Sequence, residues 1–178
     1  MRVIGTGFLI VPLALRKPVD VFMAHILIVC TANICRSPVA AALLRDRLQR
    51  RGLNDWVVRS AGTWAQEKRG ASQYSLELMA QRGLDISDHQ AEMIDRRHMK
   101  EADLVLCMES GHAEALRVEF PWAADKIFLM SEMMGKKYSI SDPYGRSRDA
   151  YESMVVELVR LTDAGLDEII SRAEQLAV

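Results

Sequence analysis

The stretch from His25 to Pro38 constrains the fold more than any other part of the sequence. Residues 25–29 form an apolar run with the composition of a buried strand, and Ser37-Pro38 is typical of a helix start. A buried strand joined to a helix by a short loop predicts one βα unit of a parallel sheet. Cys30 stands at the carboxyl end of the predicted strand, the edge at which open parallel sheets bind ligands.

The loop after Cys30 has the residues of an anion site with a thiol in its floor. The N–H groups of a tight loop and the N-terminus of the next helix direct their positive ends to one place. Cysteine is a good nucleophile only as the thiolate, which these dipoles and the Arg36 guanidinium favour. The planar fork of Arg36 fits two phosphoryl oxygens, Ser37 can donate its hydroxyl to the sulfur, and Asn33 tolerates a left-handed backbone. We therefore predict a nucleophilic cysteine in a phosphate-binding loop.

The rest of the chain alternates between short apolar strands and amphipathic helices. Strands are predicted at residues 25–30, 56–61, 103–108 and 126–130, and helices at 38–51, at 72–82, from about 110, and along 151–173. Gly165 is expected to bend or soften the last helix. This order predicts an α/β fold: a single three-layer domain with a central four-stranded parallel sheet flanked by helices and a phosphate-binding loop after the first strand.

The composition excludes several classes of protein. A chain of 178 residues, 49% of them hydrophobic, fits one globular domain, and a net charge of −1 argues against a nucleic-acid partner. The three cysteines do not make a disulfide framework, and a thiolate enzyme needs a reducing compartment, so we expect a cytoplasmic protein. The histidines lack ligand-like spacing, and no metal or other cofactor is predicted.

Residues 1–22 precede the predicted domain, which we place at residues 23–178. The uncharged run Val3–Leu15 is too short to span a bilayer and lacks the small-residue cleavage site of a signal peptide, so no stable membrane insertion is expected. Met23-Ala24 stands where a start site would, which favours a disordered tail or a segment upstream of the true start. A membrane-surface or partner-binding segment is the alternative, because its apolar side chains are costly to leave in water.

Further motifs follow one another along the chain: Ser60-Ala61-Gly62-Thr63, Asp88-His89-Gln90-Ala91, Asp103–Met108, and Asp142-Pro143-Tyr144 before the last helix. With the cysteine loop, they make roughly residues 24 to 176 resemble the low-molecular-weight protein tyrosine phosphatases, most closely the bacterial members. One position departs from that family, which usually has glycine where this loop has Ala32. A Cβ there is expected to be awkward if the residue needs a positive φ or lets the backbone approach the phosphate closely.

The resemblance implies a protein-tyrosine-phosphatase that hydrolyses phosphotyrosine through a cysteinyl-phosphate intermediate. Cys30 is then the nucleophile, Arg36 binds the phosphoryl oxygens, and Asp142 is the general acid that protonates the tyrosine oxygen. The loop residues expected to bind the substrate phosphate are Thr31, Ala32, Asn33, Ile34 and Cys35. The implied partner is a phosphotyrosine-containing protein, for example a bacterial tyrosine kinase of exopolysaccharide or capsule assembly.

Other residues are expected to surround this centre. Tyr144 is interpreted as an aromatic wall for the substrate ring, whereas Trp64 either forms the opposite wall or packs against the protein. By the resemblance, Asn33 and Ser60 hold the shape of the loop, and His89 lies near enough to add polar support. Ser37 belongs to the same supporting group.

Cys35 has two interpretations. Close to the Cys30 thiolate, it could form a reversible disulfide that blocks turnover and protects the nucleophile from further oxidation. Alternatively, Cys35 is a small residue packed under the loop. The first interpretation follows from the family resemblance.

Two rival functions are compatible with a cysteine in an anion-binding loop. An arsenate reductase of the same fold passes electrons through further downstream cysteines, but only Cys107 lies downstream here. A module that binds phosphotyrosine or another oxyanion without turnover needs neither a nucleophile nor an acid. The presence of Cys30, Arg36 and Asp142 therefore favours an enzyme.

Overall fold

The computed structural model describes residues 23–177 and contains one four-stranded parallel sheet, as predicted. The strands are β1 (His25–Cys30), β2 (Val57–Gly62), β3 (Leu104–Cys107) and β4 (Ile127–Leu129), in the order β2-β1-β3-β4. The central position of β1 explains its apolar run, because alternate side chains of the strand enter apolar clusters on opposite faces of the sheet. The proposed segment of residues 1–22 lies outside the described residues.

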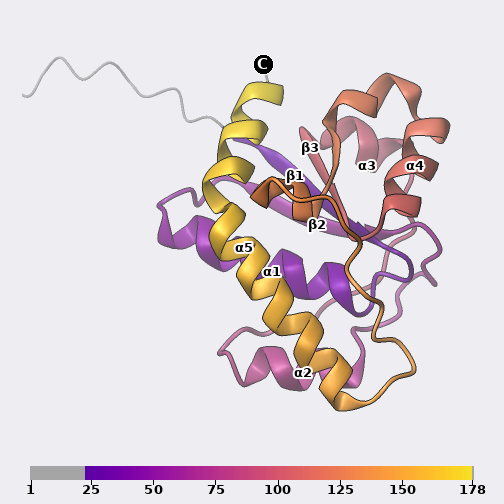
Figure 1. Ribbon diagram of the computed structural model, residues 1–178, viewed down its shortest axis with the longest axis vertical. Coiled ribbons are helices and arrows are strands. Elements are labelled where there is room, and N and C mark those ends of the chain that lie inside the picture. The colour runs from indigo at the N-terminus through magenta and orange to yellow at the C-terminus, as the bar shows by residue number, and fades with distance from the viewer. Residues whose placement is uncertain (1–22, 178) are drawn as a thin grey trace, which may run out of the picture.

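Helices α1 (Arg36–Arg50) and α5 (Arg148–Leu176) cover one face of the sheet, and α2 (Gln73–Ala80) packs against α5 (Figure 1). The larger apolar cluster of the protein lies between these helices and the sheet. Helix α1 begins at Arg36, two residues before the predicted start. Pro38 fits within this first turn because its missing N–H has no intrahelical partner to lose there.

The opposite face is covered by α3 (Arg96–Glu101), α4 (Ser110–Glu119) and the 3-10 helix η2 (Pro121–Lys126) (Figure 1). A smaller apolar cluster fills this layer, so the protein has the predicted three layers. Helix α3 was not predicted, since six residues are too few to show a helical period. A further 3-10 helix, η3 (Met130–Met134), follows β4 and packs on α5.

Gly165 does not interrupt the last helix. Helix α5 continues without a break from Arg148 to Leu176. An added Cβ at Gly165 would lie 2.9 Å from the Cβ of Met133 and 3.3 Å from its carbonyl oxygen. The helix is therefore uninterrupted at this glycine, whose missing side chain lets η3 approach α5 closely. The expected bending or softening of the helix stays a prediction.

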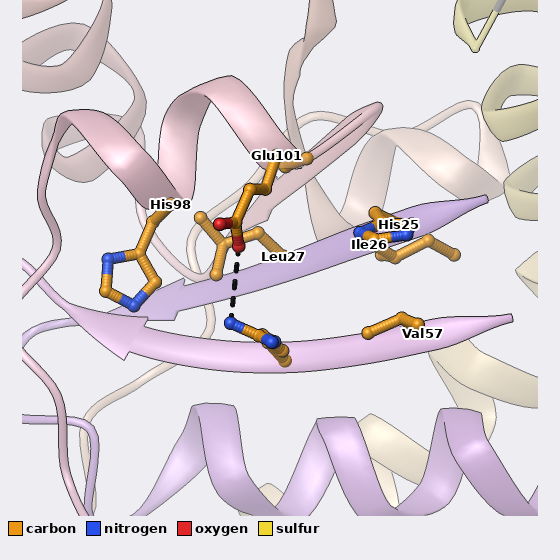
Figure 2. Close-up of a pocket in the computed structure, with 8 residues that line it drawn as sticks. His25, Ile26, Leu27, Val57, His98 and Glu101 are labelled. Atoms are coloured by element: carbon orange, nitrogen blue, oxygen red, sulfur yellow. Dashed lines mark hydrogen bonds and ion pairs between the residues drawn. The ribbon is translucent and has the colours of Figure 1, made fainter.

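The pockets at the two ends of the sheet differ in size. Toward the amino ends of β1 and β2, Figure 2 shows His25, Val57 and Glu101 around a small pocket. Glu101 forms an ion pair of 3.3 Å with Arg59. The pocket volume of about 10 Å³ leaves room for little more than one water molecule. A larger pocket lies at the carboxyl ends of the strands, beside Cys30. None of the described helices is long and apolar enough to cross a membrane.

Candidate active site

Cys30 ends β1 and lies at the bottom of the loop that leads into α1. Its Sγ is 3.0 Å from the hydroxyl oxygen of Ser37, in the first turn of that helix. Ser37 also accepts a hydrogen bond of 2.8 Å from the Asn33 amide. The Ser37 hydroxyl proton is therefore available for the sulfur, which is the contact that the sequence predicts.

Asn33 holds the loop from inside and is fully buried. Its backbone is left-handed, with φ of 54°, and its amide donates to Ser60 at 2.9 Å. Its side-chain oxygen accepts from the backbone N–H of Glu92, and its carbonyl accepts from His89 Nε2 at 2.6 Å. Burial lowers the pKa of His89, which favours the neutral ring. The structure thus brings Ser37, Ser60 and His89 around the loop, although the side chain of Asn33 lies outside the pocket wall.

Gly62, at the end of β2, lets this loop pack against the neighbouring strand. An added Cβ would lie 2.5 Å from the carbonyl oxygen of Thr31 and 3.0 Å from the backbone nitrogen of Asn33. Because both contacts are to backbone, no side chain could move to relieve the clash. Gly62 belongs to the motif Ser60-Ala61-Gly62-Thr63, and the structure supplies the physical reason for a glycine at this position.

Arg36 is only 1% exposed and points its guanidinium at several acceptors. Its NH2 donates to Asp142 at 2.7 Å and to the Thr31 hydroxyl at 3.2 Å. Its NH1 donates to the Ile140 carbonyl at 2.9 Å and forms an ion pair with Glu109. The predicted nucleophile, arginine and acid therefore converge, although Asp142 follows Arg36 by more than a hundred residues.

The pocket above Cys30 has a volume of about 300 Å³. It is lined by Cys30, Thr31, Ala32, Ile34, Cys35, Arg36, Trp64, Arg69, Asp142 and Tyr144. Trp64 is 80% exposed and Tyr144 55% exposed, so both rings stand at the mouth, where they are accessible to another group. The exposure of Trp64 favours a place in the wall over a packing role. Arg69, which the sequence analysis missed, lies 5.5 Å from the Tyr144 ring centroid and donates to its hydroxyl.

Ala32 lines the pocket without left-handed backbone. Among the described residues other than glycine, positive φ occurs at Asn33 and Lys68. The suggestion that Ala32 needs a positive φ is therefore wrong, because the tight turn is placed on the next residue. The Ala32 Cβ is therefore expected to crowd a bound phosphate only if the backbone of this residue approaches the phosphate closely.

Cys35 is buried below the loop and carries a free thiol, as does Cys30. Its Sγ is 3.4 Å from the hydroxyl of Tyr151, and burial raises the pKa of its thiol. Cys35 therefore favours the neutral form that suits a packed residue. The protective disulfide remains a prediction.

Glu109 and His112 are further site residues that the sequence analysis missed as such. Glu109 precedes α4 and pairs with Arg36, and His112, in the first turn of α4, has Nε2 3.0 Å from Thr31 Oγ1. Both follow β3, whose carboxyl end lies beside that of β1. The rule that drew attention to Cys30, ligand sites at the carboxyl ends of parallel strands, could have found them.

The described residues contain no group of three or more histidine, cysteine or acidic side chains placed to hold a metal. The positive charge available for an anion comes from Arg36 and Arg69 and from the backbone N–H groups of the loop. A thiol, a guanidinium and a carboxyl group around one pocket can bind an oxyanion, attack it and move a proton. Fold and pocket define the class: an α/β protein with a cysteine–arginine loop at the carboxyl ends of its strands.

The sequence profile described as "Low molecular weight phosphotyrosine protein phosphatase" matches residues 25–174. A probable low molecular weight protein-tyrosine-phosphatase, EpsP of Ralstonia solanacearum, is 36% identical over 81% of this chain and 94% of its own. A protein-arginine-phosphatase of Geobacillus stearothermophilus is 37% identical over 78% of this chain and 91% of its own. The crystal structure of a low molecular weight protein tyrosine phosphatase from T. tengcongensis superposes with a TM-score of 0.77 and 37% identity, covering 82% and 99% of the two chains.

The chain belongs to the low molecular weight phosphotyrosine protein phosphatase family and is a phosphatase of that family. Its similarity extends to tyrosine phosphatases and arginine phosphatases at nearly the same identity. The phosphorylated side chain that the protein accepts, tyrosine or arginine, has therefore to be inferred from the residues that line the pocket.

Proposed function

We propose that the protein is a protein-tyrosine-phosphatase that forms a cysteinyl-phosphate intermediate, with Cys30, Arg36 and Asp142 as its catalytic residues. The observation that carries this proposal is their convergence in one pocket, where Arg36 NH2 lies 2.7 Å from Asp142 and Cys30 forms part of the floor. Residues 23–178 constitute the phosphatase domain in this proposal. It needs no cofactor, because Arg36 and the loop N–H groups supply the positive electrostatics.

The first step transfers the phosphoryl group to sulfur. The Cys30 thiolate forms a bond to phosphorus while the bond between phosphorus and the tyrosine oxygen breaks. Arg36 and the N–H groups of residues 31–35 hold the phosphoryl oxygens, and the protonated carboxyl of Asp142 gives its proton to the departing oxygen. In this step the phosphate takes over the guanidinium contact that Asp142 makes in the structure.

The second step restores the enzyme. The Asp142 carboxylate takes a proton from a water molecule, whose oxygen bonds to phosphorus while the bond between phosphorus and sulfur breaks. The products are inorganic phosphate, the Cys30 thiolate and a protonated Asp142. Ser37, 3.0 Å from the sulfur, stabilises the thiolate as a leaving group by donating its hydroxyl proton.

The walls of the pocket favour a phosphorylated tyrosine over a phosphorylated arginine. The exposed rings of Trp64 and Tyr144 and the apolar side chain of Ile34 suit a flat aryl group. A guanidinium needs acceptors for its N–H groups, and Asp142 is the only carboxylate that lines the pocket in the described structure. Arg69 adds positive charge at the mouth, which disfavours a second guanidinium.

The substrate assignment is tested with matched peptides that carry phosphotyrosine or phosphoarginine at the same position. We expect kcat/KM for the phosphotyrosine peptide to exceed that for the phosphoarginine peptide at least about tenfold. The Cys30→Ser variant should retain vanadate binding and lose turnover, because a hydroxyl without a neighbouring base is a weak nucleophile. Turnover by that variant would contradict the cysteine mechanism.

The role of Asp142 is tested with aryl phosphates of different leaving groups. Asp142→Asn should slow poor leaving groups by about 10²–10⁴, and acidic phenols less, because they need less protonation. Equal losses over the series would assign Asp142 a structural role. Arg36→Lys serves as a second variant and should be nearly inactive, since a point charge does not replace the bidentate fork.

Arginine dephosphorylation is the second candidate, favoured by the 37% identity to a protein-arginine-phosphatase. Preferred hydrolysis of the phosphoarginine peptide would select it and leave the cysteine mechanism in place. For the tyrosine phosphatase we propose a cytoplasmic location, where thiols stay reduced, and a phosphotyrosine protein as partner, for example a bacterial tyrosine kinase of exopolysaccharide or capsule assembly.

A further inference from the structure

His112 is a buried histidine that contacts the reactive loop through a single hydrogen bond. It lies in the first turn of α4 and is 7% exposed, with Nε2 3.0 Å from Thr31 Oγ1. Its other ring nitrogen, Nδ1, is buried and has no hydrogen-bond partner within the described part of the chain. The imidazole therefore makes its one side-chain hydrogen bond to a residue of the pocket wall.

The surroundings of His112 decide where its proton lies. Burial lowers the pKa of His112, which favours the neutral ring with one N–H group. A proton on Nδ1 would be buried without an acceptor, whereas a proton on Nε2 meets Thr31 Oγ1. The structure therefore favours the tautomer in which Nε2 donates. The charged groups that act on the ring are Glu109 at 3.8 Å, Arg36 and Asp142.

Thr31 then receives two hydrogen bonds at one oxygen. Arg36 NH2 donates to Oγ1 at 3.2 Å. Because a guanidinium has only donors, it cannot accept the hydroxyl proton of Thr31. With Nε2–H of His112 as the second donor, both lone pairs of the hydroxyl oxygen are used. The hydroxyl proton of Thr31 is left for an acceptor in the pocket, whose wall Thr31 forms together with Cys30 and Arg36.

We propose that His112 is a positioning residue for the phosphatase reaction. Its Nε2–H fixes the Thr31 hydroxyl so that this group steadies Arg36 and donates its own proton to an oxygen of the bound phosphoryl group. The inference rests on the proposed cysteine mechanism and adds a hydrogen-bond donor for the oxyanion. It predicts that His112 affects oxyanion affinity and turnover without touching the substrate.

The experiment compares His112→Gln with His112→Asn. The glutamine amide can place its nitrogen where Nε2 lies, whereas the asparagine amide is one methylene shorter and reaches only the Nδ1 position. We expect the asparagine variant to lose about tenfold in vanadate affinity and in kcat/KM for p-nitrophenyl phosphate, and the glutamine variant to keep most of both. Circular dichroism and thermal melts verify that each variant is folded. Equal values for the two variants would overturn the proposal.

A double-mutant cycle with Thr31→Val tests whether His112 acts through the hydroxyl. In the valine background, His112→Asn should weaken vanadate binding by less than about twofold, because the group that it positions is gone. A full tenfold loss in that background would show that His112 acts by another route and would overturn the inference. Cys30→Ser is measured in parallel, because its turnover tests the proposed cysteine mechanism independently of His112. Failure of the mechanism can then be distinguished from failure of the role proposed for His112.

Discussion

At the scale of single residues, the pocket holds its arginine in place through several acceptors. Arg36 is buried, and Asp142, Glu109, Thr31 and the Ile140 carbonyl accept its hydrogen bonds. A buried guanidinium without acceptors would be costly, and these contacts offset that cost while keeping the fork aimed at the loop. In the proposed mechanism, an incoming phosphate exchanges places with Asp142 and meets an arginine that needs little reorganisation.

Ala32 gives a prediction for the residue at which this loop departs from its family. Since Ala32 does not need a positive φ, glycine would remove little strain and would add chain entropy to the unfolded state. We expect Ala32→Gly to lower the free energy of unfolding by about 0.5–1 kcal/mol and to change the vanadate Kd less than about threefold. Urea unfolding and vanadate titration measure the two effects. A markedly tighter vanadate complex would show that the Cβ crowds the anion.

At the scale of elements, glycine has different consequences in two helices. Gly165 in α5 faces Met133, whereas a Cβ added at Gly111 in α4 would meet nothing within 4 Å. Helix propensity favours alanine over glycine by about 1 kcal/mol at both positions. The close approach of η3 opposes this gain at Gly165 only, because part of the contact is to backbone.

We therefore predict opposite signs for two matched substitutions. Gly165→Ala should lower the free energy of unfolding by about 1–3 kcal/mol, because α5 and η3 must separate to admit the methyl group. Gly111→Ala, the control, should raise it by up to about 1 kcal/mol. Urea denaturation of both variants provides the comparison. Shifts of the same sign would contradict the packing account of Gly165.

Sequence patterns were sufficient to predict some of the helices and strands and not others. All four strands were predicted to within one residue, since each is a short segment between polar or turn residues. All but β2, which contains Arg59 and Ser60, are apolar apart from His25. Helix α3 and the 3-10 helices η2 and η3 are short, and no period is visible over so few residues. Their positions depend on packing against the sheet and α5.

At the scale of the whole molecule, the half-buried His89 links stability to pH. His89 joins two segments by its hydrogen bond to the Asn33 carbonyl, and burial lowers its pKa below the value of about 6.5 in an unfolded chain. As the pH falls through that value, the unfolded state binds the proton more readily than the folded state. The contribution of His89 to stability is thus present above about pH 6.5 and declines at lower pH.

His89→Gln tests this linkage, because its amide can still donate to the Asn33 carbonyl but does not titrate. Between about pH 7.5 and pH 5.5 the wild-type protein should lose more stability than the variant. Urea midpoints at several pH values measure the difference between the two slopes. Identical slopes would show that His89 does not titrate differently in the folded and unfolded states.

The sequence by itself determined the α/β class, the parallel sheet, the cysteine loop and the pairing of Cys30 with Arg36. These features follow from local patterns: strands that alternate with helices predict a parallel sheet, and a short loop fixes the distance between its own residues. Asp142 was identified only through a family motif. Its approach to within 2.7 Å of Arg36 results from the folded chain, as does the contact of His112 with Thr31.

Only the tertiary structure decided how distant segments meet. The order β2-β1-β3-β4 brings the carboxyl ends of β1, β2 and β3 together, and this places Gly62, Glu109 and His112 beside the loop. Sequence spacing carries no information about such contacts, because they depend on which strands pair and how closely two backbones approach. The same reason applies to Gly165, because its packing against Met133 is a contact between distant segments that the sequence does not reveal.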